Sequence, residues 1–183
     1  SSSLVPGGGG LRFATGIIPG RPYRSPNDSR WIIAMDTDNA ITAQDQVLMV
    51  SNSGELHITV QEGLTNLPTA QGSEPNPPPY QLTGSFDAVY GINDAGQFVF
   101  SGIDNRTGTA DDGFVVRGNA DGSFSLVAQE LITEAPAITG GSTYGSTRGS
   151  AHIDNLGRVS VLHQINGLTT ATDEFVLGRD GTQ

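Results

Sequence analysis

Residues 90–100, YGINDAGQFVF, carry the pattern that decides the fold. An apolar residue, Ile92, precedes Asn93, and Gly96 follows three positions after Asn93. An Asn side chain accepts backbone N–H bonds at the start of a turn, and glycine adopts the positive φ that the turn needs. The apolar residues after the turn are typical of a strand with a buried face. The stretch therefore predicts a β-hairpin with Gly96 at positive φ.

The same pattern recurs at residues 33–42, IAMDTDNAIT, and at residues 152–161, HIDNLGRVSV. Its acidic or amide position falls at residues 36, 93 and 154, which are 57 and 61 residues apart. We interpret the segments as three degenerate copies of one repeat. Two expectations follow for equivalent positions. Ile33, Ile92 and Ile153 should share one inward place, and Asn39 and Gly157 should share the positive φ of Gly96.

A second half follows each copy of the pattern. Residues 45–60, DQVLMVSNSGELHITV, and residues 112–127, DGFVVRGNADGSFSLV, both read as strand, turn and strand. Residues 173–181, DEFVLGRDG, begin in the same way and reach only the turn. The predicted fold is all-β, with three four-stranded antiparallel repeats shaped like propeller blades. We expect a tail with a donor-type strand at 1–20 and repeats at 21–80, 81–141 and 142–183, the last lacking its fourth strand.

The run Asn93-x-x-Gly96-x-x-Val99-Phe100 resembles the NxxGxxAF tandem-repeat proteins of bacterial cell surfaces, the choice-of-anchor type. The resemblance extends from about residue 11 to the last residue and is strongest in the middle copy. The first copy has Asn39 at the glycine position, and the third has Ser160-Val161 where Ala-Phe is expected. The resemblance implies an exported repeat protein with propeller-like β-sheets, and it implies no particular ligand.

Composition removes several functional classes. The formal charge is −10, which disfavours nucleic acid and anionic membranes as partners. All nine basic residues are Arg, so lysine Schiff bases and P-loop lysines are excluded. Cysteine is absent, and its absence excludes disulfides, thiolate metal sites and cysteine nucleophiles. No apolar run reaches membrane-spanning length, and we expect no membrane insertion.

No catalytic constellation is visible. The three histidines, His57, His152 and His163, fall on expected strands in different repeats, and neither an HExxH motif nor a Gly-x-Ser-x-Gly elbow is present. We therefore predict no catalytic residues and no enzymatic activity.

Asp and Asn gather in the expected turns, and calcium is the one metal ion that such oxygen-rich loops suggest. Ordinary turn chemistry explains the same residues better. The weak metal candidates are Asp36, Asp38, Asp104, Asp111, Asp112 and Asp121. No other cofactor is expected. Trp31, the single tryptophan, could stack on a sugar, although a core anchor is the simpler interpretation.

The N-terminal segment at residues 11–14 resembles the fourth strand that the third repeat lacks. Because open strand edges are aggregation-prone and natural sheets cover them, a truncated repeat needs a donor strand. We predict pairing of this segment with the strand at 175–177, preferentially between two chains. The predicted assembly strands contain Leu11, Phe13, Ala14, Phe175, Val176 and Leu177.

These observations favour an extracellular or cell-surface structural protein that self-assembles through β-strand donation into a ring or a filament. The alternative is a calcium-dependent or lectin-like adhesive module with carbohydrate as a partner. A hydrolase that uses loop carboxylates ranks last. A homo-oligomer or polymer fits the first hypothesis, whereas a stable monomer favours the others.

Overall fold

A computed structural model describes residues 3–14, 22–52, 54–70, 78–83, 90–107, 111–134, 143–147, 151–166 and 174–179. These residues form antiparallel β-sheets and one short 3-10 helix, η1 (Thr42–Gln44), so the predicted all-β class is confirmed. Within these ranges no helix has the length and apolar character that a membrane span requires.

The first sheet contains four strands in chain order. They are β1 (Tyr23–Arg24), β2 (Trp31–Asp36), β3 (Gln46–Asn52) and β4 (Glu55–Gln61). The strand–turn–strand unit predicted over residues 45–60 is confirmed as the antiparallel pair β3–β4, with Gly54 at φ 89° in the turn.

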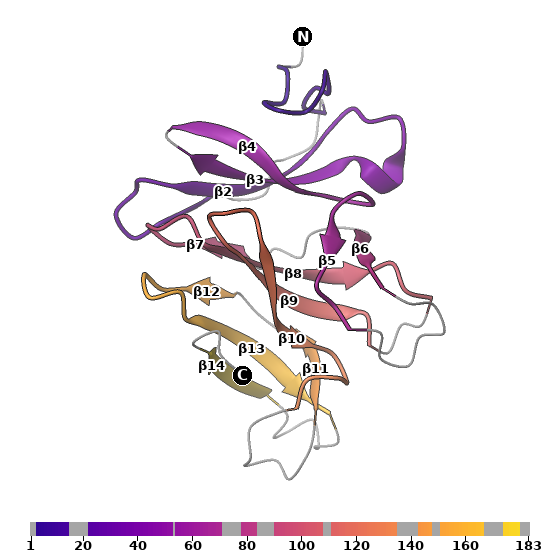
Figure 1. Cartoon of the computed structure of the whole chain (residues 1–183), viewed down its shortest axis with the longest axis vertical. Helices are drawn as coiled ribbons and strands as arrows, with labels where there is room; N and C mark the ends of the chain where they lie inside the picture. The colour runs from indigo at the N-terminus through magenta and orange to yellow at the C-terminus, as the bar shows by residue number, and fades with distance from the viewer. Residues whose placement is uncertain are drawn as a thin grey trace.

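The second sheet contains six strands. They are β5 (Asn66–Leu67), β6 (Tyr80–Thr83), β7 (Tyr90–Ile92), β8 (Phe98–Asp104), β9 (Gly113–Gly118) and β10 (Phe124–Gln129). Strand β8 pairs with β9 on one side and with β6 and β7, placed end to end, on the other. The unit predicted over residues 112–127 is confirmed as β9–β10. Strands β5 and β6 turn away from the direction of β8, so this sheet is curled (Figure 1).

The third sheet repeats the plan of the second. Its strands are β11 (Tyr144–Thr147), β12 (His152–Ile153), β13 (Val159–Ile165) and β14 (Glu174–Arg179). Strand β13 occupies the place of β8, because it pairs with β14 on one side and with β11 and β12 on the other. Strand β14 therefore corresponds to β9, and to β3 in the first sheet.

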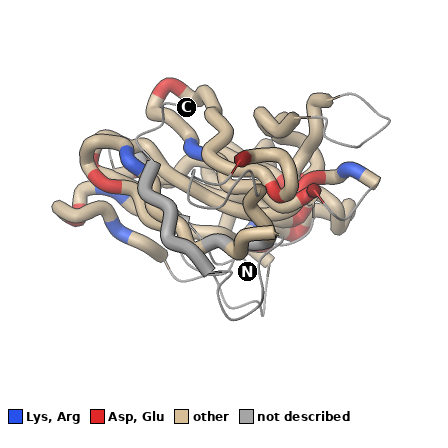
Figure 2. Tube along the Cα trace, turned by 90° about the horizontal axis from the view of Figure 1, so that it is seen from below, with Lys and Arg blue, Asp and Glu red and all other residues tan. Residues whose placement is uncertain are grey.

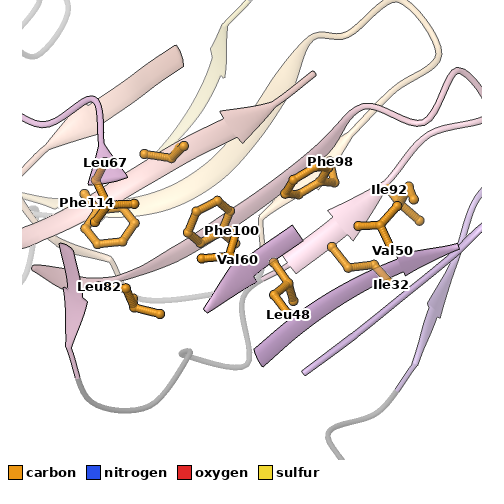
Figure 3. Close-up of a cluster of buried hydrophobic side chains, with 11 residues drawn as sticks. Ile32, Leu48, Val50, Val60, Leu67, Leu82, Ile92, Phe98, Phe100 and Phe114 are labelled. Carbon is orange, nitrogen blue, oxygen red and sulfur yellow. The ribbon is translucent and has the colours of Figure 1, made fainter. Parts of the chain in front are cut away.

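The three sheets stack face to face, and the first apolar core lies between the first two (Figure 1). Figure 3 shows this core with Ile32, Leu48, Val50 and Val60 from the first sheet facing Phe98, Phe100 and Phe114 from the second. The rings of Phe100 and Phe114 meet edge to face at 5.7 Å between centroids, an arrangement that aromatic pairs favour. The alternation of inward and outward residues along β2, β3 and β8 produces this face.

A second core of smaller side chains lies between the second and third sheets. The residues on β8, β9 and β10 that point away from the first core supply one half, and β11, β12 and β13 supply the other. Its buried members are Val99, Val115, Val127, Ala128, Tyr144, Ala151, Ile153, Val159, Val161 and Ile165. Strands β8 and β9 are thus buried on both faces, and β10 is buried toward the second core and half-buried toward the first.

The N-terminal segment, residues 3–14, covers the outer face of the first sheet. Val5 is buried against Val47 and Met49, and Leu11 and Phe13 pack around them. Backbone bonds fix the segment, because the Ala14 N–H donates to the Asp36 carbonyl and the Asp38 N–H donates to the Arg12 carbonyl. Phe13 also forms an isolated bridge with Thr37.

The predicted alignment of the first repeat is wrong by one strand. The turns at 93–97 and 154–158 join β7 to β8 and β12 to β13, and the corresponding turn in the first sheet is 25–30, between β1 and β2. Ile92 and Ile153 are buried before their turns, whereas Ile33 lies within β2 and faces the N-terminal segment. Residues 36–39 have the spacing of the turn motif, but they lie at the C-terminal end of β2, whereas the equivalent turn precedes its N-terminal end.

The φ angles predicted for the three turns are confirmed in the second and third turns and wrong in the first. Gly96 and Gly157 have φ values of 84° and 78°, which confirms both predictions. Asn39 is not among the described residues with positive φ, so that prediction is wrong. Asp28, at φ 60°, takes the glycine place in the first turn. The Asn39 side chain instead organises the loop before β3, where its amide donates to the Gln44 carbonyl.

Candidate functional site

Two of the predicted metal ligands surround a buried arginine. Both carboxylate oxygens of Asp104 accept from the Arg106 guanidinium, each at 2.7 Å, and Asp111 lies 3.2 Å away. The guanidinium also lies over the Tyr80 ring at 4.5 Å. Burial would lower the pKa of Arg106, but hydrogen bonds and charge from Asp104 and charge from Asp111 raise it overall. The carboxylates of Asp104 and Asp111 thus neutralise the buried positive charge of Arg106. A bidentate contact, as between Arg106 and Asp104, is the stronger geometry for an arginine–carboxylate pair.

The same cluster anchors the segment that follows β5. The Ala70 carbonyl accepts from both Arg106 and Gln129, each at 3.0 Å, and the Ala70 N–H donates to the Gln129 side chain at 2.8 Å. Gln129 is fully buried at the end of β10. The cluster therefore fixes the segment after β5 against the second sheet, which is a structural role.

The other candidate ligands are dispersed. Asp36 ends β2, where burial and then the nearby Asp45 raise its pKa. Asp38 accepts from the Arg12 N–H, and Asp121 accepts from Ser123, whose bonds lower the Asp121 pKa. Burial raises the pKa of Asp112. Across the described residues, no three His, Cys, Asp or Glu side chains converge as a metal site requires.

Three equivalent turns form a ladder at one edge of the stack; we call them the first (25–30), second (93–97) and third (154–158) turn. Each closes on itself, since the N–H of its first residue donates to the carbonyl of its last: Ser25 to Arg30, Asn93 to Gln97 and Asp154 to Arg158. Asn93 and Asp154 also cap their own turns with a side-chain oxygen.

The backbone N–H bonds that connect these turns run to the next turn along the chain. The Asn27 N–H donates to Oδ1 of Asp94 at 3.0 Å, and the Asp94 N–H donates to Oδ1 of Asn155 at 3.0 Å. The Asn155 amide returns a bond to Oδ2 of Asp94 at 2.6 Å. The completely buried Asn93 adds a bond from its amide to the Asp154 carbonyl at 2.8 Å. Each turn thus donates to the next along the chain.

Glycine permits the close approach of successive turns. A Cβ on Gly96 would lie 3.2 Å from the Arg30 guanidinium, and a Cβ on Gly157 would lie 2.8 Å from the Gln97 side chain. Arg30 and Gln97 are the last residues of the turns that precede these glycines. The positive φ favours glycine at both places, and the missing Cβ leaves room for the side-chain ends of Arg30 and Gln97 from the preceding turn.

The third turn ends the ladder in the described part of the chain. Its Asn155 N–H holds the position of the linking donor, yet no described group accepts from it. Leu156 is 77% exposed, the most exposed of the large apolar side chains in the described residues. The pKa of Asp154 is lowered, chiefly by the hydrogen bond from the Arg158 N–H. Slight desolvation raises this pKa, and the hydrogen bond from the Arg158 side chain lowers it further.

An open strand edge lies beside this turn. Strand β3 pairs with β4 and β9 pairs with β10, whereas β14, as far as the structure describes the chain, pairs only with β13. Phe175, Val176 and Leu177 lie on β14 opposite His163, Leu162 and Val161. Within one chain, Leu11, Phe13 and Ala14 contact the first sheet instead, at the opposite end of the stack. Pairing between two chains stays a prediction.

An open cleft of about 380 Å³ lies on the outer face of the first sheet, next to the first turn. Trp31, Ile33 and Leu56 supply its apolar surface and Ser29 lies at the turn. The Arg24 guanidinium stacks on the Trp31 ring at 4.0 Å and fixes its orientation. Trp31 is half-buried and belongs to none of the buried clusters, which does not favour the core-anchor interpretation.

Charge lies mainly in the loops and turns around the sheets, as the view in Figure 2 shows. His57 and His152 are exposed, on β4 and β12, and His163 lies on β13. The described residues thus offer two surfaces of interest, the third-sheet edge with its turn and the cleft on the first sheet.

No protein-family model, curated protein or solved structure matches the chain.

The sequence contained one signal for the ladder that its motif analysis missed. Each turn carries two adjacent Asn or Asp residues, at 27–28, 93–94 and 154–155. In each turn at least one residue of the pair bonds to a neighbouring turn. The pair at 27–28 lies before β2, as the pairs at 93–94 and 154–155 lie before β8 and β13, but the sequence has similar pairs at 38–39, 104–105 and 111–112.

Proposed function

We propose that the protein is an extracellular or cell-surface structural protein whose copies assemble when the third sheet receives a β-strand from another copy. The position of β14 carries the proposal. In the first two sheets the corresponding strands, β3 and β9, have a partner on their far side, namely β4 and β10. Main-chain pairing at such an edge supplies affinity without a ligand pocket. Each sheet would then act as one blade-like repeat.

Two further features support a structural role. The cluster around Arg106 and the turn ladder use their polar groups to hold the fold together. The resemblance to NxxGxxAF repeat proteins supports export and a surface location, and the acidic charge suits a soluble subunit.

The donor strand is the N-terminal segment in this proposal. In residues 11–14 only Arg12 is exposed, the other three residues are half-buried, and a few backbone bonds hold the segment at the end of β2. Donation requires this segment to leave its own first sheet. The backbone pairing gained along β14 of the partner must therefore offset the contacts that the segment loses at its own first sheet.

Hydrogen exchange measured over a range of protein concentrations tests the proposal. The amides of residues 174–179 should become more protected as concentration rises, because the unpaired edge of β14 gains a partner. The amides of residues 113–118, which already have β10 beside them, provide the internal reference and should not change.

A variant lacking residues 1–14 separates the acceptor from the donor. If β14 keeps its concentration-dependent protection in this variant, the N-terminal donor is wrong and another strand pairs there. If β14 shows no such protection in the complete chain, assembly by strand donation is wrong.

A further inference from the structure

We propose that the third turn of one copy docks in the Trp31 cleft beside the first turn of a second copy, so that copies stack head to tail. This inference rests on the self-assembly proposed above, but it uses the turn edge of the stack and does not involve β14. The partner is a second copy of this chain, and the two contacting surfaces are different.

The direction of the turn ladder is the first reason. The backbone N–H groups of Asn27 and Asp94, each three residues before the last residue of its turn, donate to the turn that follows, and among the described residues only the side-chain amide of Asn155 donates back. The third turn holds the next such donor, the N–H of the exposed Asn155, which donates to no group in the described part of the chain. A group with this direction fits another turn that follows in the same sense, and it does not fit a copy of itself face to face.

The apolar groups at the two ends are complementary. Leu156 projects from the third turn with 77% of its side chain exposed. At the other end of the stack, Trp31 and Leu56 form an apolar cleft of about 380 Å³ on the outward face of the first sheet. The cleft is large enough for a leucine side chain, and burial of apolar surface favours the contact.

The N-terminal segment leaves this part of the first sheet accessible. Val5, Leu11 and Phe13 cover the region of Val47 and Met49. Leu56 lies at the border between that cluster and the cleft, and Trp31 lies outside the cluster. The cleft lies beside the first turn, whose Ser29 hydroxyl can accept a hydrogen bond. A second copy placed here continues the order in which the sheets and turns already stack within one chain.

A contact between two different surfaces does not close on itself when the copies are related mainly by translation. Each added copy then offers a new third turn, and the association is open-ended. This route of growth needs no strand exchange and can precede it.

Cysteine cross-linking tests the docking, because the natural chain contains no cysteine. One chain carries Ser29→Cys and a second, mass-tagged chain carries Leu156→Cys; both positions are exposed. Under mild oxidation, the mixed disulfide dimer should form roughly tenfold faster or more than in the control, because docking raises the effective thiol concentration. A chain with both substitutions should form a series of linked multimers.

The control pairs Ser29→Cys with Ile41→Cys, since Ile41 is 54% exposed in the loop at the opposite end of β2. Equal rates for the test and control pairs would overturn the proposal. Faster pairing of Leu156→Cys with itself than with Ser29→Cys would also overturn it, because that result indicates a symmetric contact.

A second pair of variants keeps the test independent of thiol chemistry. Leu156→Asp should lower self-association, and the matched change Ile41→Asp should not. If Leu156→Asp has no effect on association, docking through this turn is wrong. If the β14 amides become protected but no cross-link forms, strand donation is supported and turn docking is wrong. If the cross-link forms but the β14 amides are not protected, turn docking is supported and strand donation is wrong.

Discussion

The outer face of the first sheet and the outer face of the third sheet have opposite characters. Val47 and Met49 on the first sheet are fully buried, because residues 3–14 lie over them. On the third sheet, Ser160, Leu162 and Gln164 alternate with the buried residues of β13 and are only half-buried. The two ends share a strand plan, so the difference comes from the N-terminal segment. Among the described residues, the centre of the outer face is thus more deeply buried at the first-sheet end than at the third-sheet end, so the two ends differ and any association has a direction.

The largest expected effect is the loss of stability when a buried side chain is truncated, compared between the two outer faces. Met49→Ala removes a completely buried side chain and should lower the free energy of unfolding by about 2–5 kcal/mol. Leu162→Ala, at the half-buried face, should cost clearly less. Denaturant titration of both variants measures the comparison, and equal losses would show that the third sheet is covered as well as the first.

A charge introduced into the N-terminal segment tests whether that segment covers the first sheet in solution. Val5→Asp places a carboxylate where 4% of the side chain is exposed and should cost roughly 1–3 kcal/mol. Leu4→Asp, one residue earlier and 57% exposed, is the matched control and should have little effect. Similar melting temperatures for the two variants would mean that residues 3–14 do not seal this face.

Two glycine substitutions sharpen the account of the turn ladder. Gly157→Ala combines positive φ with a Cβ that would lie 2.8 Å from the Gln97 side chain. Gly122→Ala has a similar φ but open space around its Cβ, so it should show the backbone strain alone, roughly 1–2 kcal/mol. Gly157→Ala should therefore be the more destabilising by chemical unfolding. The reverse order would contradict close stacking of the second and third turns.

The smallest effect concerns pH. The pKa of Asp154 in the folded state is below its ordinary value of 3.8, chiefly because of the hydrogen bond from the Arg158 N–H. A lowered folded pKa stabilises the protein above the unfolded pKa, and this contribution is lost as the pH falls through the folded pKa. Asp154→Asn should thus reduce the loss of thermal stability between about pH 6 and about pH 3. An unchanged loss would remove Asp154 from the acid response.

Local turn chemistry made much of the fold predictable. The β3–β4 and β9–β10 hairpins follow from glycine-containing turns between alternating strands, and Gly96 and Gly157 have the expected φ values. The first repeat was misaligned because Asp36 and Asn39 copy the spacing of Asn93 and Gly96. Its true turn is one residue longer and uses Asp28 at positive φ, so a fixed spacing could not find it.

The location of the N-terminal segment was harder to predict. The residues around Phe13 suit any sheet with an uncovered edge or face, and short-range patterns do not choose between the first and third sheets. Contacts of Val5 with Val47 and Met49 decide the matter within one chain. The buried pair of Asp104 and Arg106 was missed as a pair, because the acidic residues were considered only as cation ligands.

Sedimentation velocity over a wide range of protein concentrations tests the central claim, directional self-association, most directly. If copies associate head to tail, the weight-average mass should rise with concentration from the 19.1 kDa of one chain to values above that of a dimer. Leu156→Asp should shift this rise to higher concentration. A mass that stays at 19.1 kDa throughout would contradict self-association, and a plateau at the dimer would contradict the open head-to-tail arrangement.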